Sequence, residues 1–128
     1  MLHVSDLPDA PDPAVIAAND ASRRILRMQG DDCVSPRRVD FGFRRRRIFA
    51  VRPDQLRADL AELGFQPLPF GTRTGAEGDM ILSIQASPYA ADFDRLDSMV
   101  SRVAAREGWT CTGWSAAVRE AVRRLRPA

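Results

Sequence analysis

Residues 30–49 constrain the fold most, because a turn rich in Gly, Asp and Pro leads directly into a strand-like alternation. Val39, Phe41 and Phe43 point to one side of an extended chain, and the residues between them are polar or glycine. A strand with one apolar side is expected to lay that side on a core. The alternation fails from Arg45 onward, which predicts a bulge or the end of the sheet.

A helix is predicted before this stretch, over residues 13–30. Asp12 suits the N-cap, Pro13 suits the first turn, and Gly30 suits the C-cap. Apolar or small residues recur between them near the helical period and predict one buried stripe, formed by Val15, Ile16, Ala18, Ser22, Ile25, Leu26 and Met28.

In the middle of the chain, segments with the apolar repeat of a helix alternate with segments that have the composition of a strand. Residues 54–63 and 93–104 place apolar side chains on one helical face, so we predict two helices there. Residues 80–87 predict a strand. Residues 65–70 are apolar but contain two prolines, which suits an edge strand, and residues 71–79 have the composition of a loop.

The last element has two interpretations. Residues 109–118 fit a final strand with an irregularity at Gly113, followed by a short basic helix or tail over residues 119–125. A single helix over residues 115–125 fits the same sequence, and the periodicity leaves both open.

The predicted order is helix, strand, helix, strand, strand, helix, strand. Two split strand-helix-strand units with short links indicate an α+β ferredoxin-like sandwich. Such a fold has a four-stranded antiparallel sheet with two helices on one face, and the N-terminal helix is an addition to it.

The composition of the chain is that of a folded protein, since 45% of its 128 residues are hydrophobic and 28% are charged. We predict a flexible N-terminal arm over residues 1–13. Residues 14–128 are predicted to form a single ferredoxin-like domain with a basic C-terminal tail. A net charge of +2 does not by itself indicate a nucleic-acid binder.

The cellular location is predicted to be cytoplasmic. Cys33 and Cys111 belong to no CxxC pair, which favours two free thiols in a reducing compartment. The N-terminal residues have neither the basic start nor the apolar run of a signal peptide. No apolar run is long enough to cross a bilayer, so no membrane association is expected.

Residue chemistry predicts no catalytic site, no metal site and no cofactor. The adjacent carboxylates of Asp31 and Asp32 lack a third ligand at a recognisable spacing, and we interpret them as a solvated turn after the helix. His3 is the only histidine and lies in the predicted arm. Cys111 has no base nearby in sequence, which favours a buried structural thiol. Three convergent ionisable side chains in one pocket would instead favour an enzyme.

The sequence feature that most strongly indicates an exposed surface is a run of four arginines, namely Arg44, Arg45, Arg46 and Arg47. One interpretation is a solvated strand end that prevents edge pairing, and the other is a surface for an anionic partner, either an acidic protein or a nucleic-acid backbone. We expect further arginines to extend such a surface, namely Arg37, Arg38, Arg119, Arg123, Arg124 and Arg126.

Direct RNA binding is the alternative function. The sequence Phe41-Gly42-Phe43 partly matches the aromatic-Gly-aromatic centre of the RNA-recognition motif, but Val39 and Asp40 stand where that motif has a basic residue and a glycine. Core positions are the favoured interpretation, since Val39 shares the face of both phenylalanines. Exposure of these rings would favour RNA, whereas burial would exclude base stacking.

Short motifs stand at intervals along the predicted elements, namely Gly30-Asp31-Asp32, Pro36-Arg37, Val39-Asp40-Phe41, Leu63-Gly64-Phe65 and Thr112-Gly113-Trp114. Together they resemble one known family, the regulator of ribonuclease activity B (RraB) family. The resemblance covers residues 14–118 and implies a ferredoxin-like, non-enzymatic, cytoplasmic protein, some members of which bind ribonuclease E and inhibit its action on RNA. The matching positions, which we expect to be structural, are Gly30, Asp31, Asp32, Pro36, Arg37, Asp40, Phe41, Gly113 and Trp114.

The family's Asp-Gly-Trp-Gly signature reads Thr112-Gly113-Trp114-Ser115 here, and the basic end of this chain contrasts with the acidic tails of better-known inhibitors. Charge largely sets which partners are attracted. We therefore predict a protein-binding regulator whose partner is a protein, hypothetically a ribonuclease. Its contact surface is predicted to be the arginine run together with the exposed part of Trp114.

Overall fold

A computed structural model describes residues 10–46, 53–67 and 80–120. The predicted order of helices and strands is confirmed. The elements are α1 (Pro13–Met28), β1 (Arg37–Arg45), α2 (Pro53–Ala61), β2 (Gln66–Pro67), β3 (Met80–Ala86), α3 (Phe93–Arg106) and β4 (Trp109–Ala116).

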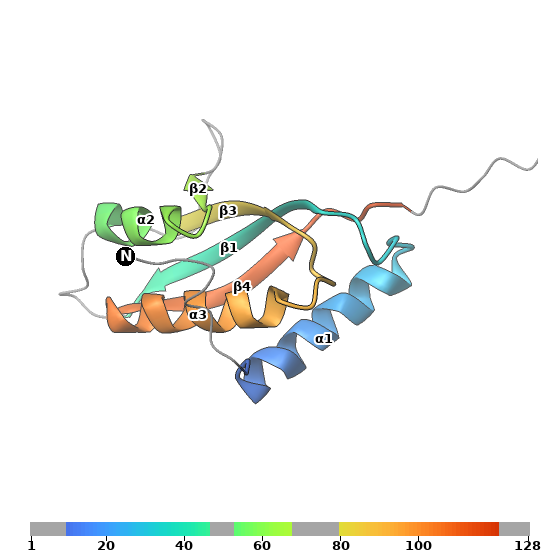
Figure 1. Ribbon diagram of the computed structural model, residues 1–128, viewed down its shortest axis with the longest axis horizontal. Coiled ribbons are helices and arrows are strands. Elements are labelled where there is room, and N and C mark those ends of the chain that lie inside the picture. Colours follow the sequence, from blue (N-terminus) through green and yellow to red (C-terminus); the bar gives the residue numbers. More distant parts are fainter. Residues whose placement is uncertain (1–9, 47–52, 68–79, 121–128) are drawn as a thin grey trace, which may run out of the picture.

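The four strands form one antiparallel sheet in the order β2-β3-β1-β4, so β1 and β3 are central and β2 lies at an edge as predicted. Helices α2 and α3 lie side by side on one face of the sheet (Figure 1). The additional helix α1 lies beside α3 on the β4 side. The fold is therefore the predicted ferredoxin-like α+β sandwich with an extra N-terminal helix.

The core lies between β1 and the two covering helices. Val39, Phe41 and Phe43 are at most 1% exposed, which confirms the face predicted from their alternation. Each is paired in register with an apolar residue of β3 on the same face, respectively Ile84, Leu82 and Met80. The Phe41 ring packs edge-on against Phe65, at a centroid distance of 5.2 Å.

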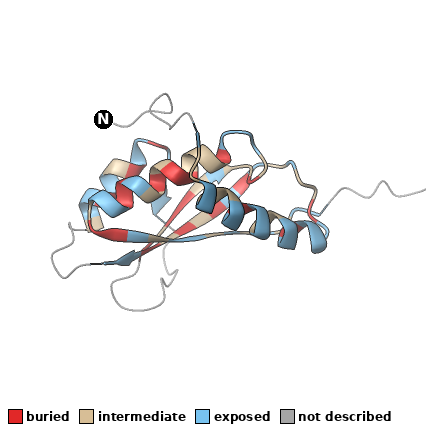
Figure 2. Ribbon diagram, turned by 90° about the horizontal axis from the view of Figure 1, so that it is seen from below, coloured by how far each residue is buried: buried red, intermediate tan, exposed pale blue. Residues whose placement is uncertain are grey.

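The covering helices supply the other half of the core. In Figure 2 the buried residues gather on the sides of the helices and strands that face each other. The leucines predicted to share one face of the second helix are all buried, namely Leu56, Leu60 and Leu63. The third helix contributes Phe93, Val100, Val103 and Ala104.

Strand β4 contains the irregularity predicted at Gly113. The register shifts there because Thr112 is an extra residue between the Gly42–Gly113 and Phe43–Cys111 pairs. Gly113 has a φ of +118°, a conformation that L side chains rarely adopt. The alternative helix over residues 115–125 is wrong for the described residues, because Ser115 and Ala116 belong to β4 and residues 117–120 are not helical.

The predicted apolar stripe of α1 is wrong in part. Leu26 is buried, but Ile25 is 57% exposed and Met28 is 82% exposed. The inward side instead includes Asn19, which is 2% exposed. The physical reason is that α1 does not cover the sheet but lies along its side, so that only a narrow face of the helix meets the protein.

Several predictions fall on residues outside the described part of the chain. These are the N-terminal arm through residue 9, the strand continuation over residues 47–49, the loop over residues 71–79, and the basic tail from residue 121 onward. Within the described part, no helix has the length and hydropathy that crossing a bilayer requires.

Gly113→Ala is expected to lower the free energy of unfolding by about 1–3 kcal/mol, because the bulge holds this residue at positive φ. No atom lies within 4 Å of a Cβ built there, so the cost comes from the backbone and not from a clash. Urea denaturation measures it, with Ser115→Ala on the same strand as the control. A Gly113→Ala protein as stable as this control would contradict the account.

Candidate functional site

The arginine end of β1 consists of Arg44, Arg45 and Arg46, and all three residues are exposed. Arg44 pairs with Thr110 of β4 and points away from the helices, since it alternates with Phe43. Arg45 points to the opposite side of the strand. The fourth arginine of the run, Arg47, lies outside the described residues.

Two contacts hold the arginine end, one through a side chain and one through the backbone. The guanidinium of Arg45 lies over the ring of buried Trp109, 5.2 Å from the ring centroid, in a cation–π contact. The backbone N–H of Arg46 donates to the Gly108 carbonyl at 2.8 Å. The basic side chains thus project from a backbone that is anchored to β4 and to the end of α3.

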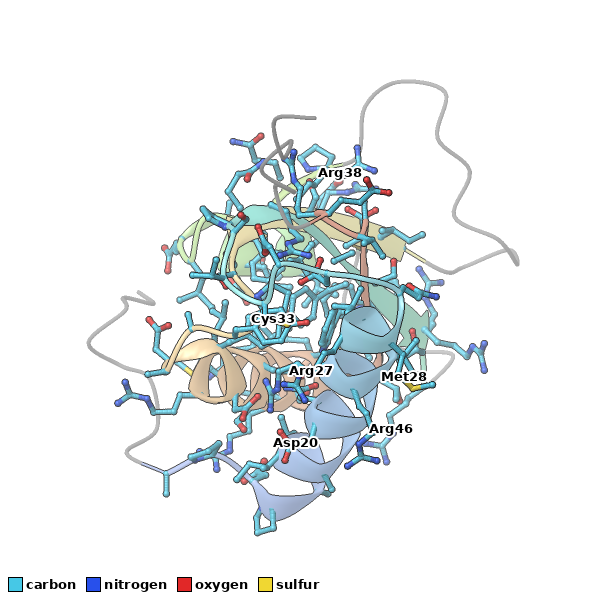
Figure 3. All side chains as sticks on the ribbon, turned by 90° about the vertical axis from the view of Figure 1, so that its right-hand side faces the viewer. Asp20, Arg27, Met28, Cys33, Arg38 and Arg46 are labelled. Carbon is cyan, nitrogen blue, oxygen red and sulfur yellow. The ribbon has the colours of Figure 1, made fainter. Side chains whose placement is uncertain are left out.

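The face of the sheet opposite α2 and α3, called the open face here, is polar apart from Ile81, which pairs with Gly42. Its hydroxyl and amide residues are Ser83, Gln85, Thr110, Thr112 and Ser115. On β1 it carries Arg38, whose Nε lies 3.1 Å from Oδ1 of Asp40. Figure 3 shows Arg38 on the side of the sheet away from the helices. The open face therefore joins the arginine end through Arg44.

Arg37, predicted to extend the basic surface, is instead buried and only 2% exposed. Its guanidinium forms an ion pair with Asp31 and a second with Asp32 at 3.1 Å. It also donates to the carbonyls of Ser35 at 3.0 Å and Ala117 at 3.2 Å. Because Arg37 alternates with Arg38 on β1, only the second of these arginines reaches solvent.

The prediction of a solvated turn is wrong for Asp31. Its carboxylate accepts hydrogen bonds from the backbone N–H of Cys33 at 3.0 Å and of Arg119 at 2.7 Å, besides the Arg37 pair. Asp32 is half-buried and accepts from the N–H groups of Val34 and Ser35, both at 3.0 Å. Together these contacts tie the turn before β1 to the chain leaving β4.

The two carboxylates are held ionised. Burial acts to raise the pKa of Asp31, but hydrogen bonds from the Arg37 guanidinium and from backbone N–H groups outweigh it and lower the pKa. Hydrogen bonds from the Ser35 hydroxyl, followed by those from backbone N–H groups, lower the pKa of Asp32 to about 2. Neither residue is thereby suited to proton transfer near neutral pH.

Trp114 is half-buried at the junction of α1, α3 and β4. Its ring packs edge-on against Phe93, with centroids 5.1 Å apart, and its indole N–H donates to Oδ1 of Asn19 at 2.7 Å. The indole donor is thus used inside the protein, on the sheet face opposite the open face. The structure does not bring Trp114 together with the arginine end.

Sequence reasoning missed a polar network that attaches α1 to the domain. The Asn19 amide donates to Asp94 at 2.8 Å, and Arg23 donates to the same carboxylate at 2.8 Å and to the Pro88 carbonyl at 3.0 Å. Burial acts to raise the pKa of Asp94, but these donors hold it below its usual value. The sequence feature that could have indicated this network is Asn19, a polar residue within the otherwise apolar stripe predicted for the first helix.

Burial shifts the pKa of two further ionisable groups among the described residues, Cys111 and Glu107. Burial raises the pKa of the Cys111 thiol to about 11, so the thiolate is disfavoured at neutral pH. Burial and the neighbouring Asp59 raise the pKa of Glu107 to about 7, as expected for two close carboxyl groups. In the ionisable cluster around Arg37, the Arg37 and Asp31 side chains are 1% and 0% exposed, whereas the Asp32 side chain is 18% exposed.

Within residues 10–46, 53–67 and 80–120, no group of three or more His, Cys, Asp or Glu side chains is placed to hold a metal ion. Both cysteines are free thiols. Comparisons of the chain with family models, curated proteins and solved structures give no match. The resemblance to the RraB family remains a prediction from the motifs.

Arg37→Met is expected to lower the free energy of unfolding by about 3–5 kcal/mol, because it leaves the buried Asp31 carboxylate without its cation. The matched control is Arg38→Met in the next residue of β1, where an exposed ion pair contributes about 1 kcal/mol or less. Urea denaturation compares the two proteins. Equal destabilisation by both substitutions would contradict the buried role of Arg37.

Stability is also expected to fall in acid through Asp32, whose pKa drops from 3.8 to about 2 on folding. A lowered carboxylate pKa stabilises the fold above pH 3.8, and this contribution is lost as the pH falls toward about 2. In a plot of the urea midpoint against pH, Asp32→Asn should flatten this acidic part of the curve. Ser35→Ala should flatten it only in part, because the backbone N–H groups still donate to Asp32. Identical profiles for all three proteins would contradict the assignment.

Proposed function

We propose that this chain is a non-enzymatic, cytoplasmic regulator that binds a protein partner, resembling inhibitors of ribonuclease E. The resemblance of the motifs to the RraB family supports the class of partner. The observation that carries the proposal is the arginine end of β1, where Arg44, Arg45 and Arg46 are exposed on an anchored backbone.

The chemistry of the arginine end favours carboxylates of an acidic protein segment. A guanidinium is a planar fork of donors that binds carboxylates in a bidentate manner. Trp109 holds the guanidinium of Arg45 in place, which lowers the entropy lost when a partner binds. Regulation would follow from occlusion, since a domain bound at an acidic segment of a ribonuclease excludes RNA sterically and electrostatically.

The burial of the aromatic side chains argues against RNA recognition by base stacking. Phe41 and Phe43 are at most 1% exposed and lie under the helices. The open face carries no aromatic side chain among the described residues, whereas single-stranded RNA is usually read on aromatic platforms. Backbone contacts by arginine alone would remain, and these depend steeply on salt.

The double substitution Arg44→Glu/Arg46→Glu is expected to weaken binding to a purified ribonuclease of the E type at least about tenfold and to abolish inhibition of RNA cleavage. Calorimetry gives the affinity and a cleavage assay gives the inhibition. The control Arg57→Glu/Arg102→Glu makes the same change in net charge on exposed side chains of α2 and α3 and should leave both unchanged.

Equal losses in both double variants would mean that only the overall charge matters. Absence of any ribonuclease binding by the unsubstituted chain, together with RNA retention that weakens steeply with salt, would replace the proposal by direct RNA binding.

A further inference from the structure

Strand β3 has a free outer edge over its last three residues. Its inner edge pairs with β1 along the whole strand, from Met80 to Ala86. Its outer edge pairs with β2 only at Leu82 and Ser83, because β2 is two residues long. Figure 1 shows this short strand beside the longer β3. We call the outer edge of residues 84–86 the free edge of β3.

The turn that leaves α2 faces the free edge but does not pair with it. The backbone N–H groups of Leu63, Gly64 and Phe65 donate back to carbonyls of α2, at 2.9 Å, 3.0 Å and 3.2 Å. No backbone hydrogen bond joins this described turn to residues 84–86. Successive residues of a strand turn their N–H and C=O groups to opposite edges, so at least one of these three residues presents both groups outward. The free edge therefore offers a backbone donor and a backbone acceptor.

The free edge lacks the usual protection against pairing. Exposed strand edges are commonly blunted by a charged residue, a proline or a bulge. Strand β2 carries Pro67 at the outer edge of the sheet, whereas residues 84–86 read Ile-Gln-Ala and contain neither a charge nor a proline. The pairing of β3 with β1 has no register shift, so no bulge turns this edge away. The backbone of the free edge is thus open to another strand.

A groove of about 560 Å³ lies along the free edge. Its wall on the helix side is apolar and includes Leu63 and the half-buried Ile84. Its other rim belongs to the open face, where Arg38 and Gln85 line the groove as cross-strand neighbours. The Arg38 side chain is 53% exposed and pairs with Asp40. A guanidinium has five N–H donors, more than one carboxylate uses, so Arg38 can bind a second anion in the groove.

The two sides of the groove define which segment fits it. Side chains of an extended segment alternate between the two faces of a sheet. One residue would therefore meet Arg38 on the open face, and the next would meet Leu63 and Ile84 on the helix side. A carboxylate suits the first position and an aliphatic side chain suits the second. Backbone hydrogen bonds to the free edge would supply affinity, and the two side-chain positions would supply specificity.

We infer that the free edge of β3 binds an extended segment of a partner protein by strand addition, and that acidic and aliphatic residues alternate in this segment. Three added residues span about 10 Å, so the contact is short and belongs to the weak, transient class. The inference goes beyond the proposed function and is independent of the arginine end, because Arg38 and Arg44 lie toward opposite ends of β1.

Fluorescence anisotropy of the full chain with a labelled, capped peptide of alternating glutamate and valine tests the inference. The same peptide with methylated backbone nitrogens cannot donate to the free edge and should bind at least about tenfold more weakly. Arg38→Met should weaken binding of the unmethylated peptide to a similar degree, because the carboxylate loses its cation. The matched control Arg24→Met removes an exposed arginine from α1 and should leave the affinity unchanged.

Nuclear magnetic resonance of the isotopically labelled chain locates the peptide. Saturation should shift the amide resonances of residues 84–86 and slow hydrogen exchange of an outward amide among them, while the amides of α1 stay unchanged. No binding at about 1 mM peptide, equal binding of the methylated peptide, or binding that leaves these amides unaffected would overturn the inference. Protection of the same amides that rises with protein concentration in the absence of peptide would also overturn it, by assigning this edge to a second copy of the chain.

Discussion

The buried guanidinium of Arg37 is the constraint on which the ends of the sheet depend. A charge closed to solvent must be paired and hydrogen-bonded, or it destabilises the fold by several kcal/mol. Its partners are Asp31 and Asp32 from the turn before β1 and the Ala117 carbonyl after β4. Pairing the charge of Arg37 and satisfying its hydrogen bonds therefore fixes both how the chain enters the central strand and how it leaves the last one.

The sequence was sufficient to predict those parts of the fold in which one face of an element meets a single large core. The alternation of Val39, Phe41 and Phe43 and the helical spacing of Leu56 and Leu60 report such burial directly, and all five are buried. Local chemistry also located the bulge at Gly113. Periodicity works at these positions because the partner surface is broad and apolar.

The same reasoning was wrong where burial depends on a polar partner far away in sequence. Asp31 looks like a solvated turn residue until Arg119 and Arg37 are brought to it. Likewise, the inward face of α1 is chosen by the hydrogen bond between Asn19 and Trp114 as well as by apolar contacts. The exposure of Arg44 follows from its alternation with buried Phe43, but the sequence does not identify the molecule that Arg44 binds.

The strand order has a consequence for how this chain is made. The central strand β1 is synthesised early, yet both of its neighbours, β3 and β4, come from the later part of the chain. Until Trp109–Ala116 has left the ribosome, Phe41 and Phe43 have only part of their sheet and the Arg37 guanidinium lacks its Ala117 acceptor. Non-local pairing of this kind slows folding, so the nascent chain exposes an incomplete core during much of its synthesis.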